Sequence, residues 1–207
     1  MDHLPTLESV LEEARVLGLL GPDSVERHIG HARTLATRVD PPDSFLDLGS
    51  GAGVPGLALA IVWPNSRGAL LDASVRRIAF CERAIVRLQL GDRVVSIRSR
   101  AETAGREPDL REQFGLVVAR SFARPAVTAE CAAPFVRPGG WLLVSEPPEA
   151  KSATDRWPTE PLADLGFGPA DPATGAEVSS VVMEKRWPLS DRYPRRTGIP
   201  AKRPLWV

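Results

Sequence analysis

The sequence predicts an α/β fold, a doubly wound and mainly parallel sheet with helices ahead of its first strand. Three observations predict this fold. From residue 44 onward, short apolar segments alternate with longer amphipathic ones, a rhythm typical of parallel strands joined by crossover helices. A glycine-rich turn directly follows the first apolar segment, where such folds bind ligands. Hydrophobic residues make up 43% of the 207 residues, enough to bury one core.

Two helices are expected ahead of the sheet. Apolar residues recur at helical spacing over residues 6–20, with Thr6 as the N-cap and Gly21-Pro22 as the stop. A second helix is expected to begin near residue 22 and to end before Pro41-Pro42. We therefore expect residues 1–40 to form a helical cap.

Strands and helices then alternate along the chain. The expected strands have the sequences FLDLG, GALLDA, RVVSIRS, FGLVVAR and GGWLLVSE, at residues 45–49, 68–73, 93–99, 114–120 and 139–146. The helices between them are expected at residues 57–63, 74–90 and 124–136. After residue 147 the composition shifts to Pro, Gly and Ala, with a short helix expected over residues 160–168 and a last strand over residues 178–187. We expect one Rossmann-like domain over residues 41–190, with a Pro- and Arg-rich basic tail, residues 191–207, packed on it.

The charge balance limits the choice of partners. The chain has 26 basic and 26 acidic residues, so any surface for nucleic acid must be local. Cys81 and Cys131 lie in apolar or alanine-rich segments, which suits buried thiols in a reducing compartment. No group of metal-ligating residues stands out, and the longest apolar run, residues 57–63, is far too short to span a bilayer. We expect a cytoplasmic monomer that binds neither metal nor membrane.

The stretch FLDLGSGAGVPG, residues 45–56, contains two overlapping nucleotide-binding patterns. From Gly51 it fits G-x-G-x-x-G, the turn that binds dinucleotides, and from Asp47 it fits D-x-G-x-G-x-G, a nucleoside-binding turn. In both patterns the glycines let the backbone approach a ligand at the end of the first strand. A tight turn that binds no ligand is a third interpretation.

The acid at position 47 favours S-adenosylmethionine over a dinucleotide. Its carboxylate would repel a pyrophosphate at the start of the following helix, whereas the sulfonium and ammonium groups of S-adenosylmethionine suit it. Asp72 ends the second strand, where an acid accepts hydrogen bonds from ribose hydroxyls in either class of cofactor. Arg100-Ala101-Glu102 follows the third strand and is placed to flank an adenine.

Six segments carry a resemblance to a known family. They are RHI (27–29), DLGSGAGVPGLALAI (47–61), LLDASVRRIAF (70–80), SRAE (99–102), VVARSFA (117–123) and RYPRRTGIPAKRPLW (192–206). In this order they resemble the bacterial 16S ribosomal RNA guanine-N7 methyltransferases, also called glucose-inhibited division protein B. The glycine turn is common to many methyltransferases, whereas Pro55-Gly56 and the RYPRR pattern are more specific.

The resemblance implies a class I S-adenosylmethionine-dependent methyltransferase fold and methyl transfer to guanine N7 in small-subunit ribosomal RNA. The glycine turn would hold the methionine side of the cofactor, Asp72 the ribose, and Ala101 with Glu102 the adenine. The residues expected to bind the cofactor are Asp47, Gly49, Ser50, Gly51, Gly53, Asp72, Ala73, Ala101, Glu102 and Arg120.

Two residues are candidates for catalysis. Guanine N7 has an in-plane lone pair, so attack on the sulfonium methyl needs alignment rather than a general base. Arg120, at the end of the fourth strand, is suited to orient the base through O6 or to hold a phosphate; an ion pair at the strand end is the alternative. His28 approaches the acceptor from the cap or packs between cap and sheet.

The tail and the end of the fifth strand are the expected RNA contacts. The tail has one acid, Asp191, among several basic residues, so it suits RNA phosphates, although its Pro and apolar residues also suit a structural strap. Glu146 is suited to accept from guanine N1–H and N2–H, or lies in a solvated loop. The residues expected at the RNA are Glu146, Arg192, Arg195, Arg196 and Lys202.

The chain departs from the family pattern in three places. Glu146-Pro147 replaces the usual Lys-Gly, His31-Ala32 replaces Asp-Ser after the RHI segment, and the N-terminal helical region is short. A methyltransferase for another nucleic acid or a small molecule, and a cofactor-binding module without turnover, therefore remain alternatives; a dehydrogenase is more distant.

Overall fold

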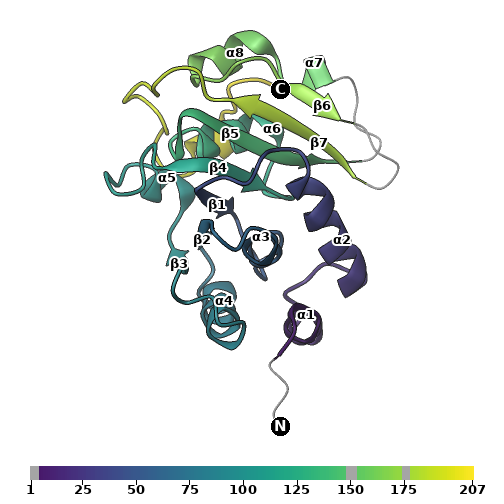
Figure 1. Cartoon of the computed structure of the whole chain (residues 1–207). Coiled ribbons are helices and arrows are strands. Elements are labelled where there is room, and N and C mark those ends of the chain that lie inside the picture. Colours follow the sequence, from purple (N-terminus) through teal and green to yellow (C-terminus); the bar gives the residue numbers. More distant parts are fainter. Residues whose placement is uncertain (1–4, 148–152, 174–177) are drawn as a thin grey trace.

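All the strands that the structure describes belong to one sheet. The computed structural model describes residues 5–147, 153–173 and 178–207. The strands are β1 (Ser44–Leu48), β2 (Arg67–Asp72), β3 (Val94–Arg98), β4 (Phe114–Ala119), β5 (Val136–Glu146), β6 (Asp171–Ala173) and β7 (Ser179–Glu184). They lie in the order β3-β2-β1-β4-β5-β7-β6 (Figure 1). The first five strands are parallel and β7 is antiparallel to both β5 and β6, so the predicted mainly parallel sheet is confirmed.

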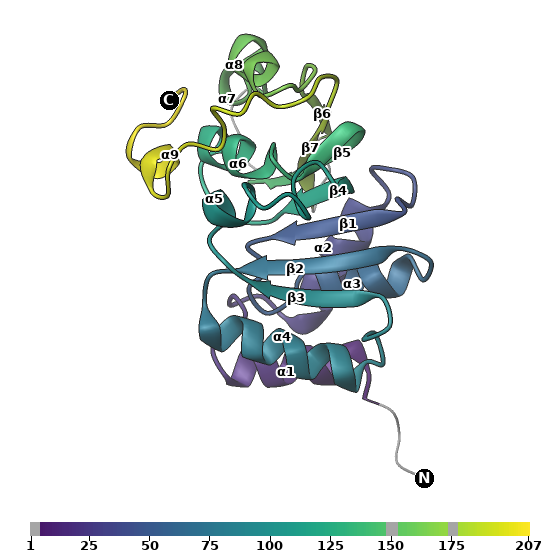
Figure 2. The ribbon, with the colours of Figure 1, turned by 90° about the vertical axis from the view of Figure 1, so that its left-hand side faces the viewer.

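Helices cover both faces of the sheet, as Figure 2 shows. They are α1 (Leu7–Val16), α2 (Val25–Ala36), α3 (Gly56–Val62), α4 (Val75–Arg87), α5 (Ala101–Ala104), α6 (Pro125–Ala132), α7 (Ala153–Arg156), α8 (Thr159–Asp164) and α9 (Ile199–Lys202). Residues of α1 to α4 share one buried cluster, and residues of α5, α6, α8 and the tail share the other. Neighbouring strand residues alternate between the clusters, Phe45 in the first and Leu46 in the second, because successive side chains point to opposite faces.

Several boundaries differ from the prediction. The first helix ends at Val16 rather than near residue 20, since Gly18 has φ of +65°. The helix predicted over residues 124–136 ends at Ala132, because Pro134 has no amide hydrogen to continue it. Phe114 pairs with Val136 and Leu116 with Trp141, so β5 begins with an irregular segment. The short elements α5, α7, β6 and α9 carry too little periodicity to be predicted from the sequence.

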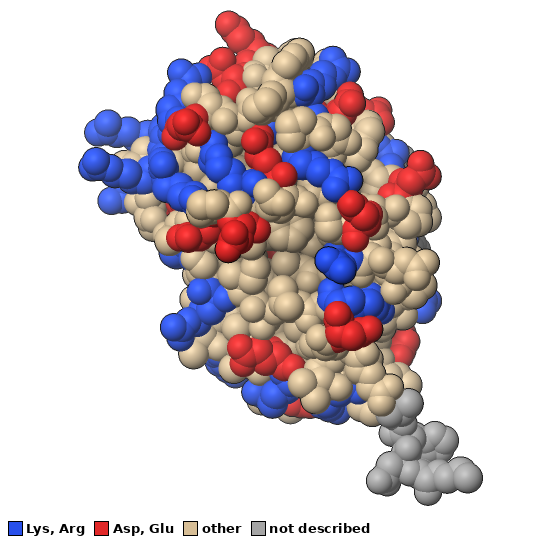
Figure 3. Space-filling view, turned by 60° about the vertical axis from the view of Figure 1, so that its left-hand side comes forward, with Lys and Arg blue, Asp and Glu red and all other residues tan. Residues whose placement is uncertain are grey.

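The tail is attached to the domain by charged side chains. The guanidinium of Arg195 donates from Nε and Nη2 to the fully buried carboxylate of Glu130, at 2.9 and 2.5 Å. Glu102 Oε1 accepts from the amide of Gly198 at 2.9 Å, and Arg111 Nη1 donates to the carbonyl of Tyr193 at 3.0 Å. Figure 3 shows lysine and arginine side chains gathered on the side where Figure 2 places α9. The tail is therefore a strap whose outer surface is basic.

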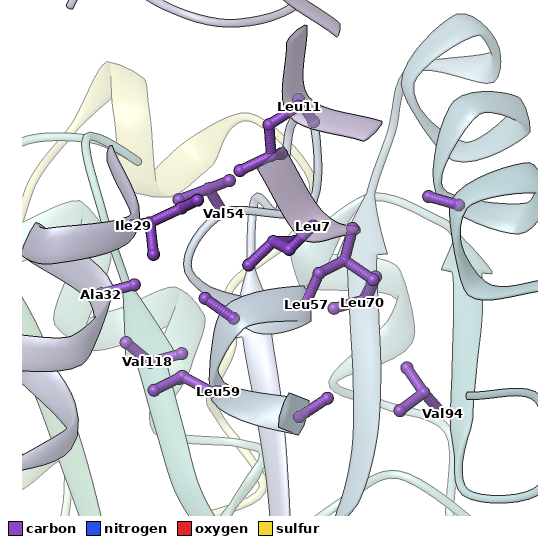
Figure 4. Close-up of a cluster of buried hydrophobic side chains, with 14 of the residues drawn as sticks. Leu7, Leu11, Ile29, Ala32, Val54, Leu57, Leu59, Leu70, Val94 and Val118 are labelled. Carbon is purple, nitrogen blue, oxygen red and sulfur yellow. The ribbon is translucent and has the colours of Figure 1, made fainter. Parts of the chain in front are cut away.

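The two N-terminal helices pack into the same core as the sheet. Thr6 and Ser24 cap them by accepting from the amides of Ser9 and Arg27, at 3.3 and 3.2 Å. Figure 4 shows side chains of α1 and α2 meeting those of α3 and β2. Their apolar faces are thus buried against the domain, while the connection between them and polar residues of α2 lie at the clefts described below.

The strap predicts a difference between two charge-removing substitutions. Glu130→Gln leaves Arg195 without its buried partner, so we expect the free energy of unfolding to fall by about 2 kcal/mol. A fully buried ion pair would lose more, but the side chain of Arg195 is 26% exposed. Asp164→Asn removes the exposed partner of Arg192 and should cost less than about 0.5 kcal/mol. Urea denaturation checks both values, and equal effects would contradict the assignment of Arg195 as the anchor.

Candidate active site

The site begins at the glycine turn between β1 and α3. Gly49, Gly51 and Gly53 have φ of +72°, +56° and +82°, values that glycine adopts at little cost. The amides of Gly49 and Ser50 donate to the carbonyl of Leu71 at 2.8 and 3.0 Å. The turn therefore lies against the carboxyl end of β2.

Asp72 fastens this turn to β2. Its Oδ2 accepts from the amide of Gly51 at 3.1 Å and its Oδ1 from the amide of Ser74 at 2.8 Å. Arg77 Nη1 lies 3.3 Å from the same carboxylate. Ala73, which follows, is exposed. The predicted ribose acid thus lies beside the turn, with an arginine that the sequence analysis did not single out.

Asp47 supports the turn from β1. Its side chain is buried and Oδ2 accepts from the amide of Gly56 at 2.7 Å, at the start of α3. Burial raises the pKa of this carboxyl to about 7, and the Gly56 hydrogen bond and Arg120 oppose the rise. Its contact is with the start of α3 rather than with the cleft above the turn, so direct contact with the methionine group stays a prediction.

A cleft of about 300 Å³ opens above the turn. Its walls are the turn itself, Arg77, Arg120 and residues 19–23 of the connection between α1 and α2. The hydroxyl of Ser50 is buried there and has no hydrogen-bond partner among the residues the structure describes. Because an unpaired buried hydroxyl is costly, this group suits a polar ligand. The bare glycine backbone, Ser50 and Asp72 together fit a nucleoside cofactor.

A second cleft, of about 360 Å³, lies beside the first. It is bounded by α2, by the connection between β4 and α6, and by the end of β5 with α7. Asp23, Arg120 and Ser121 line both clefts. Phe122 lines only the second, and its ring packs on Gly49, where an added Cβ would lie 2.5 Å from it. The end of β4 therefore separates two adjoining compartments.

His28 holds Arg120 at this boundary. Arg120 Nη2 donates to His28 Nδ1 at 2.6 Å, and His28 Nε2 lies 3.4 Å from the carbonyl of Gly21. Burial lowers the pKa of His28, and the neighbouring guanidinium lowers it further, so the ring is neutral with its hydrogen on Nε2. Both ring nitrogens are engaged, and these are the contacts of a residue that orients Arg120. A catalytic role for His28 stays a prediction.

Glu146 and His31 form the far wall of the second cleft. The side chain of Glu146 is 8% exposed and accepts from Arg156 Nε at 2.5 Å and from Trp157 Nε1 at 3.2 Å, so the alternative of a solvated loop residue is wrong. His31 Nε2 lies 2.9 Å from Ser145 Oγ. Burial, followed by the charge of Arg120, lowers the pKa of His31 to about 4.

The remaining predicted residues lie away from the two clefts. Ala101 and Glu102 begin α5, and the Glu102 carboxylate binds Gly198 of the strap. Arg195 is committed to Glu130 and Arg192 pairs with Asp164 at 3.2 Å. Arg196 and Lys202 are exposed. Contacts of all these residues with cofactor or RNA stay predictions.

Comparison with known proteins decides the family. The family model described as rRNA small subunit methyltransferase G matches residues 18–156. The chain belongs to this family. A ribosomal RNA small subunit methyltransferase G from Pelotomaculum thermopropionicum is 37% identical over 82% of the chain and 73% of its own length. One from Thermotoga neapolitana is 38% identical over 78% of the chain and 71% of its own length.

Solved structures place the fold of this family member among methyltransferases. An O-methyltransferase from Bacillus cereus in complex with SAH has a TM-score of 0.62 at 18% identity, covering 88% of this chain and 92% of that one. An O-methyltransferase family protein from Burkholderia thailandensis has a TM-score of 0.57 at 14% identity, covering 86% and 57%.

The family decides between the two patterns of the glycine turn: the protein is an S-adenosylmethionine-dependent methyltransferase. Among the described residues, no group of His, Cys, Asp and Glu is placed to hold a metal ion. None of the described helices has the length and apolar character needed to cross a membrane.

Sequence reasoning missed several residues of the second cleft. Phe122 lies within the VVARSFA segment that carried the family resemblance, so that segment was the signal for it. Arg156 and Trp157 lie in a Pro- and Ala-rich stretch without periodicity, where no local pattern marked them. Both became visible only through their contacts with Glu146.

The glycine turn predicts a selective effect of adding one methyl group. Gly49→Ala combines positive φ with a clash against Phe122, at a cost of about 1–3 kcal/mol, so affinity for S-adenosylhomocysteine should fall at least roughly tenfold. Gly139→Ala has a similar φ, +78°, with no atom within 4 Å of the new Cβ and should leave the affinity unchanged. Isothermal titration calorimetry makes the comparison, and unchanged binding by Gly49→Ala would refute the placement of the cofactor.

His31 predicts how stability depends on pH. Its pKa falls from an unfolded value of 6.5 to about 4 in the folded protein, so only the unfolded chain gains this proton as pH falls between those values. The stabilisation is therefore complete above pH 6.5 and is lost progressively toward pH 4. We expect His31→Gln, which retains a hydrogen-bonding group near Ser145, to flatten the pH dependence of Tm in this range; an unchanged slope would contradict burial of a neutral ring.

Proposed function

We propose that the protein transfers a methyl group from S-adenosylmethionine to N7 of a guanine in small-subunit ribosomal RNA. One observation carries the proposal: two adjoining clefts, one walled by a nucleoside-binding turn, share Arg120 at their boundary. The names of the curated relatives support ribosomal RNA as the acceptor. The described residues of a single chain line both clefts, so we propose a monomer, acting in the cytoplasm.

The geometry suits a reaction governed by alignment. S-adenosylmethionine supplies an electrophilic methyl group on a sulfonium. The chain contributes position: the glycine turn holds one partner, and the second cleft receives the other with Phe122 as a flat wall. Neither histidine is required to accept a proton, since N7 offers its lone pair without one. The neutral state of His28 is therefore compatible with the reaction.

Arg120 is the residue best placed to orient the guanine. Burial lowers its pKa, and the charges of Asp23 and Asp47 oppose this, so a guanidinium is kept at the junction of the clefts. One N–H group of Arg120 donates to His28, and the planar guanidinium of Arg120 has further donors for guanine O6 or a phosphate. We propose that Arg120 fixes the acceptor beside the methyl donor.

The outer side of the strap is proposed as the remaining RNA surface. Arg196 and Lys202 are exposed there, and the basic side chains in Figure 3 gather on the same side. The total charge of the molecule is zero, so this local excess is what phosphates would meet. Arg195 is excluded from the set, because its guanidinium neutralises Glu130.

Arg120 supplies the test. Small ribosomal subunits from a strain lacking this enzyme are incubated with labelled S-adenosylmethionine, and the modified base is mapped. We expect label at one guanine N7, with kcat/KM falling roughly hundredfold for Arg120→Ala and also for Arg120→Lys, which keeps the charge but loses the fork.

The control is Arg67→Ala, which changes an exposed arginine at the start of β2, at the end of the strand away from Asp72. This variant should transfer methyl at the wild-type rate. Label on a base or atom other than guanine N7 would show that the proposed acceptor atom is wrong. Binding of S-adenosylhomocysteine without any transfer to the subunit would show that the acceptor is a different molecule.

A further inference from the structure

We infer that Trp206, near the end of the strap, is a positioning residue for the second cleft. That cleft is called the acceptor cleft below, because this role rests on the proposed function. Its Nε1 donates to the backbone carbonyl of Arg156 at 2.8 Å. Its ring meets the ring of Trp157 edge-on, with centroids 6.5 Å apart and an interplanar angle of 63°. The strap thus reaches from α5, where Gly198 binds Glu102, to the wall of the second cleft.

Trp206 contacts α7, a helix too short to be stable without contacts from its neighbours. The helix α7 spans four residues, Ala153–Arg156, and a single helical turn has little stability of its own. Its position at the cleft depends on contacts made by neighbours. Trp206 fixes the backbone of Arg156 from the strap, and Glu146 fixes its side chain from β5.

Glu146, Arg156 and Trp157 form one connected unit in the cleft wall. The carboxylate of Glu146 accepts from Arg156 Nε and Nη2 at 2.5 and 3.4 Å, and from Trp157 Nε1 at 3.2 Å. Trp157 is 2% exposed, so its indole N–H has been removed from water and is satisfied by this carboxylate. Displacing α7 therefore disturbs the orientation of the carboxylate and guanidinium together.

This unit has the chemistry to select and hold a guanine nucleotide. A fixed carboxylate retains lone pairs for guanine N1–H and N2–H, and the arginine fork has N–H groups left for a phosphate. Glu146, Arg156 and Trp157 all line the acceptor cleft, whereas the residues lining the cofactor cleft include none of them. Trp206 therefore sets affinity for the acceptor and leaves affinity for the cofactor unchanged.

Variants of Trp206 separate this role from general stabilisation. Trp206→Ala removes both the donor and the ring, and Trp206→Phe removes the donor while keeping an aromatic edge. We expect KM for small subunits to rise roughly tenfold in Trp206→Ala and less in Trp206→Phe, with kcat within about twofold of wild type. The Kd for S-adenosylhomocysteine, measured by calorimetry, stays at the wild-type value. Trp187→Phe, at an exposed tryptophan outside both clefts, is the matched control.

A double-mutant cycle tests the connection directly. Arg156→Ala should raise KM to a similar extent, and Trp206→Ala combined with it should add little, because both changes remove one unit. Additive effects, an unchanged KM in folded Trp206→Ala, or equal losses in kcat and cofactor binding would each overturn the inference. These outcomes leave the proposed function intact if the wild type labels the subunit. A wild type that labels no RNA overturns both.

Discussion

The turn after β1 is the constraint on which the rest of the site depends. The chain reverses within a few residues, which requires backbone conformations that glycine adopts readily, and it is held there by two carboxylates from neighbouring strands. Asp47 binds the start of α3 and Asp72 binds Gly51. Once the turn is fixed, Gly49 provides the surface on which Phe122 packs, and Phe122 in turn forms part of the second cleft. The geometry of both compartments thus follows from one segment.

The sequence predicted the features that depend on local patterns. The strand of Asp47 was visible because an apolar run enters a glycine-rich turn, and the strand of Asp72 because an apolar run ends in an acid; parallel strands bring such ends to one edge. The wall built from Glu146 and Arg156 was not visible, because these residues belong to different elements and the second lies where no periodicity exists. Side-chain pairing across elements depends on packing that no window of sequence contains.

The roles of the arginines in the tail were also not predictable from local sequence. Its composition was compatible with an RNA contact and with a strap, and only the burial of Glu130 shows what Arg195 does. Arginine serves as a backbone clamp elsewhere in the same region, since Arg106 and Arg111 donate to carbonyls of residues 189–194. In an arginine-rich chain, residue type alone therefore does not separate structural cations from those available to a polyanion.

The attachment of the strap also determines whether the strap could bind a nucleic acid as a flexible arm or only as a fixed part of the surface. Detaching the strap would take Arg195 from the carboxylate of Glu130, whose side chain is 0% exposed, and would leave Glu102 with Arg100 as its remaining charged partner. Such a state is too unfavourable for the strap to swing out as a flexible arm and capture RNA from a distance. RNA bound as proposed would instead meet Arg196 and Lys202 on a preformed surface, so the whole enzyme would have to be correctly oriented and little ordering entropy would be lost on docking.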